Sequence, residues 1–473
     1  MPRDWLPIVA CPVDFPLEIF DSAASQLIQH PEYNSTLILR SDQLFFSLSH
    51  FPPAIPLFPQ YHPVRYIRRR LLARRPSRDA SIDQFCSFHA SQGCTDPSLV
   101  VLTPILDPGA SLPYYHPAVH HLAFHYISSP QSPILRIDAL PLDGTPTDPS
   151  SRLYRTCLAL LETLHRYGRG AMTNYKKRVI LDILVPREPY QDLYLIMRER
   201  HKHLIDTWQE VTDPLKHVFE DISIATYLML LWKETYAGTQ PVSEDAEDVE
   251  PWRTWPRPPN GFLDFGCGNG LLTHILSAEG YQGHGIDLRS RNSWSHYPPE
   301  TQSHLHVYTF NPLLEFNIDG DPYFNPGVFI IGNHADELTP WIPVVSTLIS
   351  ASGYLSIPCC PWSFDSKYDR SSTPPYPIPD PDFVQSLNLG GFGNNESSYS
   401  MYRIWLASLS LHCGWQVECE SLRIPSTRNW AIIGRRRSTV LGERETLLNA
   451  QAIMKNVRDR GIYKARVPEG RGH

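Results

Sequence analysis

The sequence predicts an α/β protein, and three observations about its C-terminal half carry that prediction. Short apolar runs alternate with helical segments from Gly261 onward, a spacing typical of a parallel sheet with helices on both faces. The first five runs are Gly261–Phe265, Gln282–Asp287, His304–Phe310, Pro326–Gly332 and Gly353–Pro358. Two further runs, Gly414–Leu422 and Asn429–Gly434, are joined by a short turn and predict an antiparallel hairpin at one edge of a seven-stranded sheet. A glycine-rich loop directly after the first run is the third observation.

The rest of the chain divides by composition. Residues 1–150 are rich in proline, histidine and arginine, and we expect an accessory region there. Residues 151–238 have helical periodicity and are expected to pack on the α/β domain, which we place at residues 260–440. Residues 239–259 form an acidic and proline-rich linker, and residues 441–473 form a C-terminal tail.

Two helices are expected within residues 151–238. The first is indicated by four leucines at helical spacing. They are Leu153, Leu158, Leu161 and Leu164. The second begins at Asp213-Pro214, because an acidic cap followed by proline suits the first turn of a helix. Its expected buried face consists of Val218, Ile222, Ala225, Met229 and Trp232.

Composition and charge exclude several classes of protein. The 473 residues carry a net charge of −7, which argues against an electrostatic nucleic-acid coat but allows a local basic groove. Nine cysteines without a CxxC pair argue against a disulfide framework or zinc ribbon and favour a reducing compartment. The start lacks a basic-then-apolar leader, and no apolar run reaches about 18 residues. We therefore expect a cytoplasmic protein with no membrane contact.

The glycine-rich loop indicates a cofactor site. The spacing GxGxG of Gly266–Gly270 is that of S-adenosylmethionine sites, whereas dinucleotide sites have GxGxxG. Glycines let a ligand approach the backbone and the free N–H groups of the following helix. Asp287 ends the second run, where a carboxylate accepts hydrogen bonds from ribose hydroxyls. The candidate cofactor residues are Asp264, Gly266, Cys267, Gly268, Asn269, Gly270 and Asp287. Together with the strand order they predict a Rossmann-like, class I S-adenosylmethionine-dependent methyltransferase.

Five segments carry a resemblance to a known family. They are Asp264–Gly270, Gly285–Trp294, Gly332–Pro343, Pro358–Cys360 and Leu422–Trp430. Lys176–Val179 and Asp213–Asp221 add to it. The chain resembles the tRNA (uracil-2′-O-)-methyltransferase family. The resemblance implies S-adenosylmethionine as cofactor and formation of 2′-O-methyluridine at position 44 of serine tRNA. Some members carry a C-terminal zinc finger, but this chain has no cysteine after Cys419, so RNA contacts must come from elsewhere.

Four polar residues follow the fourth run, at the sheet edge where substrate enters. They are Asn333, His334, Asp336 and Glu337. Transfer to a ribose hydroxyl needs alignment and benefits from a base. Either acid is a candidate for that base, with His334 orienting the hydroxyl. Alternatively, Asp336 caps a helix that begins near Leu338.

Two other mechanisms have weaker support. The Lys-Asp-Lys-Glu tetrad of another ribose methyltransferase family is not assembled with confidence, because Lys367 is the only lysine shortly after the fifth run. Cys359-Cys360 could provide a nucleophile for uracil C5 chemistry, but buried thiols at a strand end more often pack as small hydrophobic groups. Four histidines have metal-like spacing, for which we predict packing and no metal. They are His116, His120, His121 and His125.

Basic and hydroxyl residues suggest where RNA binds. The candidates are Arg289, Arg291, Arg423, Ser426, Thr427, Arg428 and Asn429. The last five lie between the final two runs and suit phosphate and ribose contacts, although Arg423 or Arg428 could instead form a structural ion pair. tRNA is thus the expected partner, and the sequence leaves protein partners unknown.

Three basic clusters are candidate phosphate contacts. The largest has seven arginines within residues 65–78, and the others are Lys176–Arg178 and Arg435–Arg437. The first could equally be a solvated helix face or a nuclear import signal.

The loop Ser366–Ser400 is expected to shape substrate access and to move on tRNA binding. Two alternatives remain: a methyltransferase acting on a protein or small molecule, and a non-catalytic cofactor-binding module.

Overall fold

The computed structural model describes residues 4–173, 180–238, 250–313, 321–370, 375–378, 380–390 and 397–464. The chain forms two compact units, residues 1–176 and 177–473. Most of the predicted acidic run, the basic group Lys176–Arg178 and parts of the Ser366–Ser400 loop lie outside the described residues. No helix of the described chain has the length and apolar character needed to cross a membrane.

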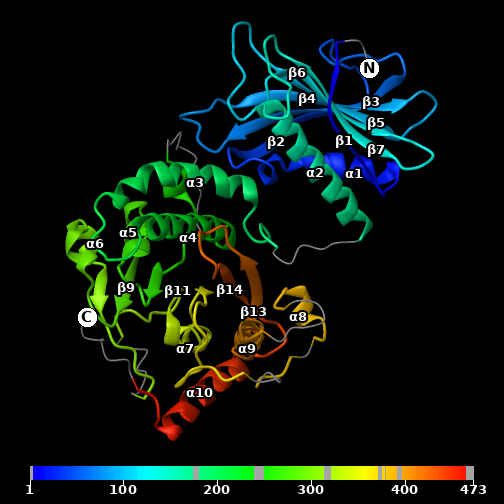
Figure 1. The fold of residues 1–473 in the computed structure, drawn as a ribbon. Helices are drawn as coiled ribbons and strands as arrows, with labels where there is room; N and C mark the ends of the chain where they lie inside the picture. Colours follow the sequence, from blue (N-terminus) through cyan, green and yellow to red (C-terminus); the bar gives the residue numbers. More distant parts are fainter. Residues whose placement is uncertain are drawn as a thin grey trace. The chain divides into compact units, whose positions relative to one another are not determined.

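The N-terminal unit is built on a seven-stranded antiparallel sheet with the order β1-β7-β6-β5-β4-β3-β2. The strands are β1 (Leu6–Pro12), β2 (Ile38–Ser47), β3 (Tyr61–Ala73), β4 (Ile82–Ser91), β5 (Pro97–Ile105), β6 (Val119–Ile127) and β7 (Ile134–Pro141). Helices α1 (Leu17–Gln29) and α2 (Arg152–Met172) pack on one face of this sheet (Figure 1), and η1 (Pro31–Tyr33) follows α1. The sequence predicts only an accessory region here, because period-two alternation is weak in strands that are largely buried.

Helix α2 belongs to this unit, which differs from the boundary expected at residue 150. Its apolar side chains join the core formed by the N-terminal sheet and α1. The buried positions are Leu153, Cys157, Leu161 and Leu164, whereas Leu158 is 38% exposed. Helical periodicity thus identified a buried face, but it does not say which surface covers that face.

The arginine-rich segment is mainly strand β3, rather than a helix. Arg65 forms an ion pair with Asp21, and Arg68 and Arg70 both pair with Asp83. Arg69 is buried and donates to the Gln84 side chain and the Ile28 carbonyl. The remaining arginines of the cluster are exposed, and they are Arg74, Arg75 and Arg78.

The predicted histidine packing is confirmed for His116, His121 and His125, whereas His120 is exposed. His116 and His125 are buried on or beside β6 and contact Gln84 and Tyr61, respectively. His121 contacts the Thr103 hydroxyl. None of these histidines belongs to a potential metal cluster in the described chain.

The C-terminal unit contains a second seven-stranded sheet, with the order β10-β9-β8-β11-β12-β14-β13. Its strands are β8 (Phe262–Phe265), β9 (Gly283–Asp287), β10 (Leu305–Val307), β11 (Phe329–Asn333), β12 (Gly353–Ile357), β13 (Trp415–Ser421) and β14 (Trp430–Arg437). The first five pair in parallel, and β14 is antiparallel to both β12 and β13. All seven overlap the predicted apolar runs. Strand β10 is shorter than the third run, because it lies at the sheet edge, where Val307 is 61% exposed.

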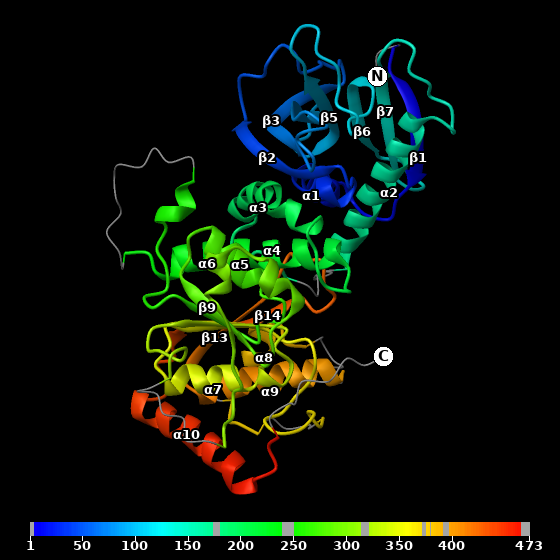
Figure 2. The same ribbon diagram turned by 90° about the vertical axis from the view of Figure 1, so that its left-hand side faces the viewer.

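Helices cover both faces of this sheet (Figure 2). One layer consists of α3 (Arg187–His201), α4 (Pro214–Thr235) and α5 (Leu271–Ala278), and the other of α7 (Trp341–Leu348), α9 (Ser398–His412) and α10 (Glu443–Arg460). Short elements connect them: η2 (Lys202–Ile205), η3 (Pro251–Thr254), η4 (Asn292–His296), α6 (Pro299–Gln302), η6 (Asp336–Leu338) and α8 (Phe383–Ser386). The predicted start of α4 is confirmed, since the Asp213 carboxylate caps it by accepting from the Leu215 N–H at 3.0 Å. The predicted buried face of α4 is also confirmed.

The C-terminal tail differs from expectation, since it contains helix α10. Ala450, Ile453, Met454 and Val457 are buried in the same core as α7. This helix is charged over most of its surface, so its apolar stripe is narrow in the sequence.

Candidate active site

The carboxyl ends of the parallel strands meet at a cavity of about 700 Å³ in the C-terminal unit. Its wall is formed by the glycine-rich loop, the end of β9, the segment after β11, the β13–β14 turn and the start of α4. Fifteen predicted site residues line it: Asp264, Gly266, Cys267, Gly268, Asn269, Asp287, Arg289, Arg291, Asn333, His334, Asp336, Glu337, Ser426, Thr427 and Arg428. Three predicted residues are not part of the wall: Gly270, Arg423 and Asn429.

The glycine-rich loop is fixed to strand β9. The amides of Gly266 and Cys267 donate to the Ile286 carbonyl at 2.9 and 3.0 Å. Gly268 has φ +55°, and a Cβ there would meet no atom within 4 Å, so this glycine leaves open space on the cavity wall. Gly270 has φ +76°, and a Cβ there would lie 2.8 Å from Leu305 Cδ1. Gly268 therefore provides room for a ligand, whereas Gly270 provides close packing.

Asp264 presents an unpartnered oxygen at this cavity. Its side chain is buried, and Oδ2 accepts from the Thr273 hydroxyl at 2.9 Å. Oδ1 is buried without a hydrogen-bond partner in the described chain. Burial, with a smaller contribution from the Asp287 charge, raises the pKa of Asp264 to about 7. A buried carboxylate of this kind suits a cationic ligand group, and the α-ammonium of S-adenosylmethionine is such a group.

Asp287 connects the loop to the end of β9. Its Oδ2 accepts from the Gly268 amide at 2.9 Å, and its Oδ1 accepts from the Arg289 amide at 3.3 Å. Each carboxylate oxygen has a second lone pair. The side chain can therefore also accept from the hydroxyls of a ribose, and the residues present fit the cofactor.

Two acids of α4 hold the polar residues at the end of β11, and neither acid is among the predicted site residues. Glu220 Oε1 lies 3.0 Å from His334 Nε2, and Asp221 Oδ1 accepts from Asn333 Nδ2 at 3.1 Å. Although burial raises the pKa of Glu220, the bond to His334 lowers it overall. Burial and the neighbouring Asp264 and Glu220 hold the pKa of Asp221 well above its usual range. The sequence does contain a signal for these residues, because they are two adjacent acids inside a largely apolar helix. Acids in such a helix are buried only when they have a partner.

The imidazole of His334 has one nitrogen held and the other unpartnered. An ionised Glu220 only accepts hydrogen bonds, so the proton lies on Nε2 and Nδ1 carries a lone pair. Nδ1 is buried without a hydrogen-bond partner in the residues that the structure covers. His334 also has φ +54°, a backbone region that residues with a Cβ rarely adopt. His334 thus lines the cavity and has a lone pair on its buried Nδ1.

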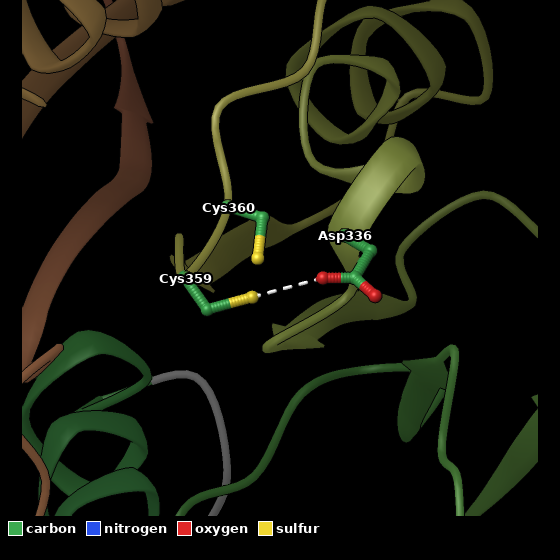
Figure 3. Close-up of side chains that lie close together, drawn as sticks. All are labelled: Asp336, Cys359 and Cys360. Atoms are coloured by element: carbon green, nitrogen blue, oxygen red, sulfur yellow. Dashed lines mark hydrogen bonds between the residues drawn. The ribbon is translucent and has the colours of Figure 1, made fainter. Parts of the chain in front are cut away.

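The predicted acids Asp336 and Glu337 lie in η6, and Asp336 has φ +44°. Asp336 Oδ1 accepts from the Cys359 thiol at 3.0 Å (Figure 3), while no side-chain capping bond starts η6 or α7. The capping role considered for Asp336 is therefore not observed. Burial and Asp336 raise the pKa of the Cys359 thiol, which disfavours the thiolate needed for attack on a uracil ring.

The β13–β14 turn divides the predicted RNA contacts. Ser426, Thr427 and Arg428 line the cavity, and the Arg428 guanidinium lies 4.0 Å from the centre of the Tyr399 ring. Arg423 instead pairs with Asp182 through two contacts of 2.7 and 2.6 Å, the structural ion pair that the sequence left open. Asn429 Nδ2 donates to the Leu422 carbonyl and holds the turn.

Arg289, Arg291 and Lys216 also line the cavity, whereas one predicted basic group has structural partners. Arg291 Nε is buried without a partner in the described chain. Lys216, exposed near the start of α4, also lines the cavity and was not predicted. In the group Arg435–Arg437, Arg435 is buried between Glu418 and Glu234, and Arg437 lies over the Trp415 ring. Arg435 and Arg437 therefore have structural partners.

Comparison with known protein families defines the class of this protein. Residues 184–312 match the family described as "Predicted AdoMet-dependent methyltransferase". Residues 1–178 match "TRM44-like, N-terminal bet v1-like domain". Together with the α/β fold and the cavity, these matches make the protein an S-adenosylmethionine-dependent methyltransferase, with S-adenosylmethionine as its cofactor.

Curated relatives then identify the family. Three proteins named tRNA (uracil-O(2)-)-methyltransferase align along most of the chain. The one from Schizosaccharomyces pombe is 36% identical over 91% of this chain and 85% of its own length. The Neurospora crassa protein is 34% identical (92% and 87%), and the Saccharomyces cerevisiae protein is 33% identical (80% and 70%). The chain belongs to the tRNA (uracil-O(2)-)-methyltransferase family, as the resemblance indicated.

Among solved structures, that of Ara h 8.0201 aligns with 36% of this chain and 98% of its own length, at 5% identity and a TM-score of 0.23. This likeness is too weak to inform the fold.

Proposed function

We propose that this protein methylates the 2′-hydroxyl of a uridine in tRNA, and that the target is position 44 of serine tRNA. The observation that carries the proposal is the shared cavity. Its wall contains both the cofactor-binding loop and a histidine whose Nδ1 is unpartnered within the described residues. The names of the relatives point to the same reaction on tRNA.

The cofactor supplies an electrophilic methyl group when bound. Asp264, Gly268 and Asp287 are the residues that would hold it, through an ammonium contact, backbone room and ribose contacts, respectively. The sheet supports a Rossmann-like class I arrangement for this domain. Its five parallel strands and antiparallel β14 place the cavity at the carboxyl edge, where α/β sheets bind their ligands.

His334 is the favoured base for the ribose hydroxyl. A 2′-hydroxyl is a weak acid, so an acceptor that takes its proton during attack lowers the barrier. Nδ1 of His334 takes that proton, and Glu220 stabilises the imidazolium that results. Asn333 is held by Asp221 and shapes the wall beside the hydroxyl. Asp336 and Glu337, the bases first considered, then contribute negative charge at the cavity.

RNA contacts are assigned to the basic and hydroxyl groups of the wall. Arg289, Arg291 and Arg428 suit phosphate oxygens, and Ser426 and Thr427 suit ribose or phosphate. Exposed arginines at the end of β3 make the N-terminal unit a candidate for further tRNA contacts. The nine free cysteines fit a reducing compartment, for which we propose the cytoplasm.

Transfer of a labelled methyl group tests the proposal. Purified full-length protein is incubated with labelled S-adenosylmethionine and with separate tRNA, protein and small-molecule fractions. Label is expected in tRNA, with serine tRNA the preferred acceptor. Label in protein or small molecules alone would overturn the tRNA assignment, and cofactor binding without transfer to any fraction would indicate a non-catalytic module.

A further inference from the structure

Three potential metal ligands meet at the edge of the cavity. Asp336, Cys359 and Cys360 each offer one ligand atom, and these atoms lie within 4.8 Å of one another. Figure 3 shows the carboxylate and the two thiols directed toward a common point. Within the residues that the structure covers, this is the one group of three or more histidine, cysteine or acidic side chains with such spacing.

The three residues come from two loops that the sheet brings together. Asp336 follows β11, and the two cysteines follow β12, its parallel neighbour. Asp336 has φ +44°, so the backbone adopts an uncommon conformation to direct this carboxylate. Such conformations persist where the surroundings fix them, and they concentrate at functional sites. The 3.0 Å contact between Cys359 Sγ and Asp336 Oδ1 confirms that the ligand atoms already face one another.

We propose that Asp336, Cys359 and Cys360 bind a thiophilic divalent cation, with Zn²⁺ as the natural candidate. Two thiolates and one carboxylate form a donor set that zinc accepts, and thiolates disfavour Mg²⁺ and Ca²⁺. On binding, the two thiols release their protons to solvent, and the ion with its three anionic ligands has a net charge of −1. Water completes the tetrahedral coordination.

The fourth coordination position would face the active-site cavity, because Asp336 and Cys359 line it. Three protein ligands and one open position are typical of catalytic zinc, whereas structural zinc has four protein ligands. An oxygen of the RNA can then replace the water, and the ion would help to position the ribose. This last role rests on the proposed function, but binding of the ion does not.

Cobalt titration tests the site without RNA or methyl transfer. Full-length protein is freed of metal with a chelator under reducing conditions and titrated with Co²⁺, whose bonds to thiolates produce charge-transfer absorption. We expect saturation at one ion per chain, and we expect Zn²⁺ to displace the cobalt. No absorption, or absorption that zinc leaves unchanged, would overturn the proposal.

Matched variants identify the ligands. Cys359→Ser and Cys360→Ser each remove one of the two thiolates and should weaken cobalt binding and reduce the charge-transfer bands, the double variant should abolish these bands, and Asp336→Asn should weaken cobalt binding ~10-fold or more. Cys94→Ser, at an exposed cysteine of the N-terminal unit, is the control and should behave as wild type. Far-ultraviolet circular dichroism of each variant reports folding. Cys360 is exposed, so its replacement should leave the fold intact even if the Cys359 variant unfolds. Cobalt affinity and band intensity equal to those of wild type in the Cys360 variant would contradict the proposal.

Discussion

Strand β3 and the wall of the cavity both contain many polar and charged residues. They differ in whether these residues have hydrogen-bond or ion-pair partners. In β3, Arg65, Arg68 and Arg70 have acidic partners, and buried Arg69 donates to Gln84. On the cavity wall, buried polar atoms have no hydrogen-bond partner in the described chain. They are Asp264 Oδ1, Asn333 Oδ1, His334 Nδ1 and Arg291 Nε.

The difference shows that charge density in a sequence is a weak indicator of function. An arginine with a carboxylate partner already has its interaction, and it stabilises the fold. A buried polar atom without a partner costs free energy, so its retention points to a ligand. Substitutions on the cavity wall and in β3 can test this contrast.

The largest effect is expected at His334. His334→Ala should lower the single-turnover rate of methyl transfer at saturating cofactor by ~100-fold or more, because a positioned base typically contributes at least that much. Cofactor affinity, measured by calorimetry, should stay within about twofold of wild type. The control is His296→Ala, at an exposed histidine of the same unit. A wild-type rate of methyl transfer in His334→Ala would exclude His334 as the base.

Removing the charge of Asp264 should weaken cofactor binding. Asp264→Asn keeps the shape and the contact with Thr273 but loses the ionic bond, so we expect affinity to fall by ~10- to 100-fold. Thr273→Val is the companion variant, which removes the hydroxyl but leaves the carboxylate and should have a smaller effect. Equal cofactor affinity in Asp264→Asn and wild type would contradict this assignment.

The raised pKa of Asp264 also predicts a pH dependence. The pKa of about 7 means that the carboxyl group is largely protonated in mildly acidic solution, so affinity should decline as pH falls below about 7. In the free protein, the folded state keeps a proton that the unfolded chain releases near 3.8, so the free energy of unfolding should decrease as pH rises toward 7. Both dependences should be weaker in Asp264→Asn than in wild type, and the raised pKa of Asp221 leaves a remaining dependence of stability. Calorimetry and denaturant unfolding across this range measure them.

Glu220 is a positioning residue, and its effect should be smaller than that of His334. Glu220→Gln preserves a hydrogen-bonding group but removes the charge that stabilises the imidazolium, so we expect kcat to fall ~10-fold with KM little changed. The lowered kcat with an unchanged KM reports this positioning role. Reduced stability with an unchanged kcat would indicate a purely structural role.

The smallest effect is expected in RNA affinity. Arg428→Ala should weaken tRNA binding several-fold and reduce the dependence of log affinity on log salt by about one. Arg68→Ala in β3 is the matched control, because Arg68 is paired with Asp83, and it should leave the salt dependence unchanged. Fluorescence anisotropy over a range of salt concentrations measures both. A reduced salt dependence in Arg68→Ala with an unchanged one in Arg428→Ala would contradict the contrast between β3 and the cavity wall.

The sequence predicted the parts of the fold that depend on local patterns. The GxGxG loop, the acid at the end of β9 and the capped start of α4 are local, because each follows from neighbouring residues. The unit that α2 joins was not predictable in this way, since its buried stripe does not identify its partner. The same limit applies to α10, whose few apolar positions are buried against α7.

The site shows the same limit. Asn333 and His334 were predicted from their position after a strand, but Glu220 and Asp221 lie more than a hundred residues earlier and reach the site through tertiary packing. Arg423 and Arg428 belong to one short turn, yet the first pairs with Asp182 and the second lines the cavity. The two arginines differ in role because their side chains point in different directions. The residue type alone does not predict this direction.

The measurement that tests the central claim most directly is the identity of the methylated nucleoside. Serine tRNA is incubated with the full-length protein and S-adenosylmethionine, digested to nucleosides and analysed by mass spectrometry. A transcript with cytidine at position 44 is the control. We predict 2′-O-methyluridine from the natural tRNA and none from the control. A uridine methylated on its base, or no methylated uridine at all, would contradict the proposed chemistry.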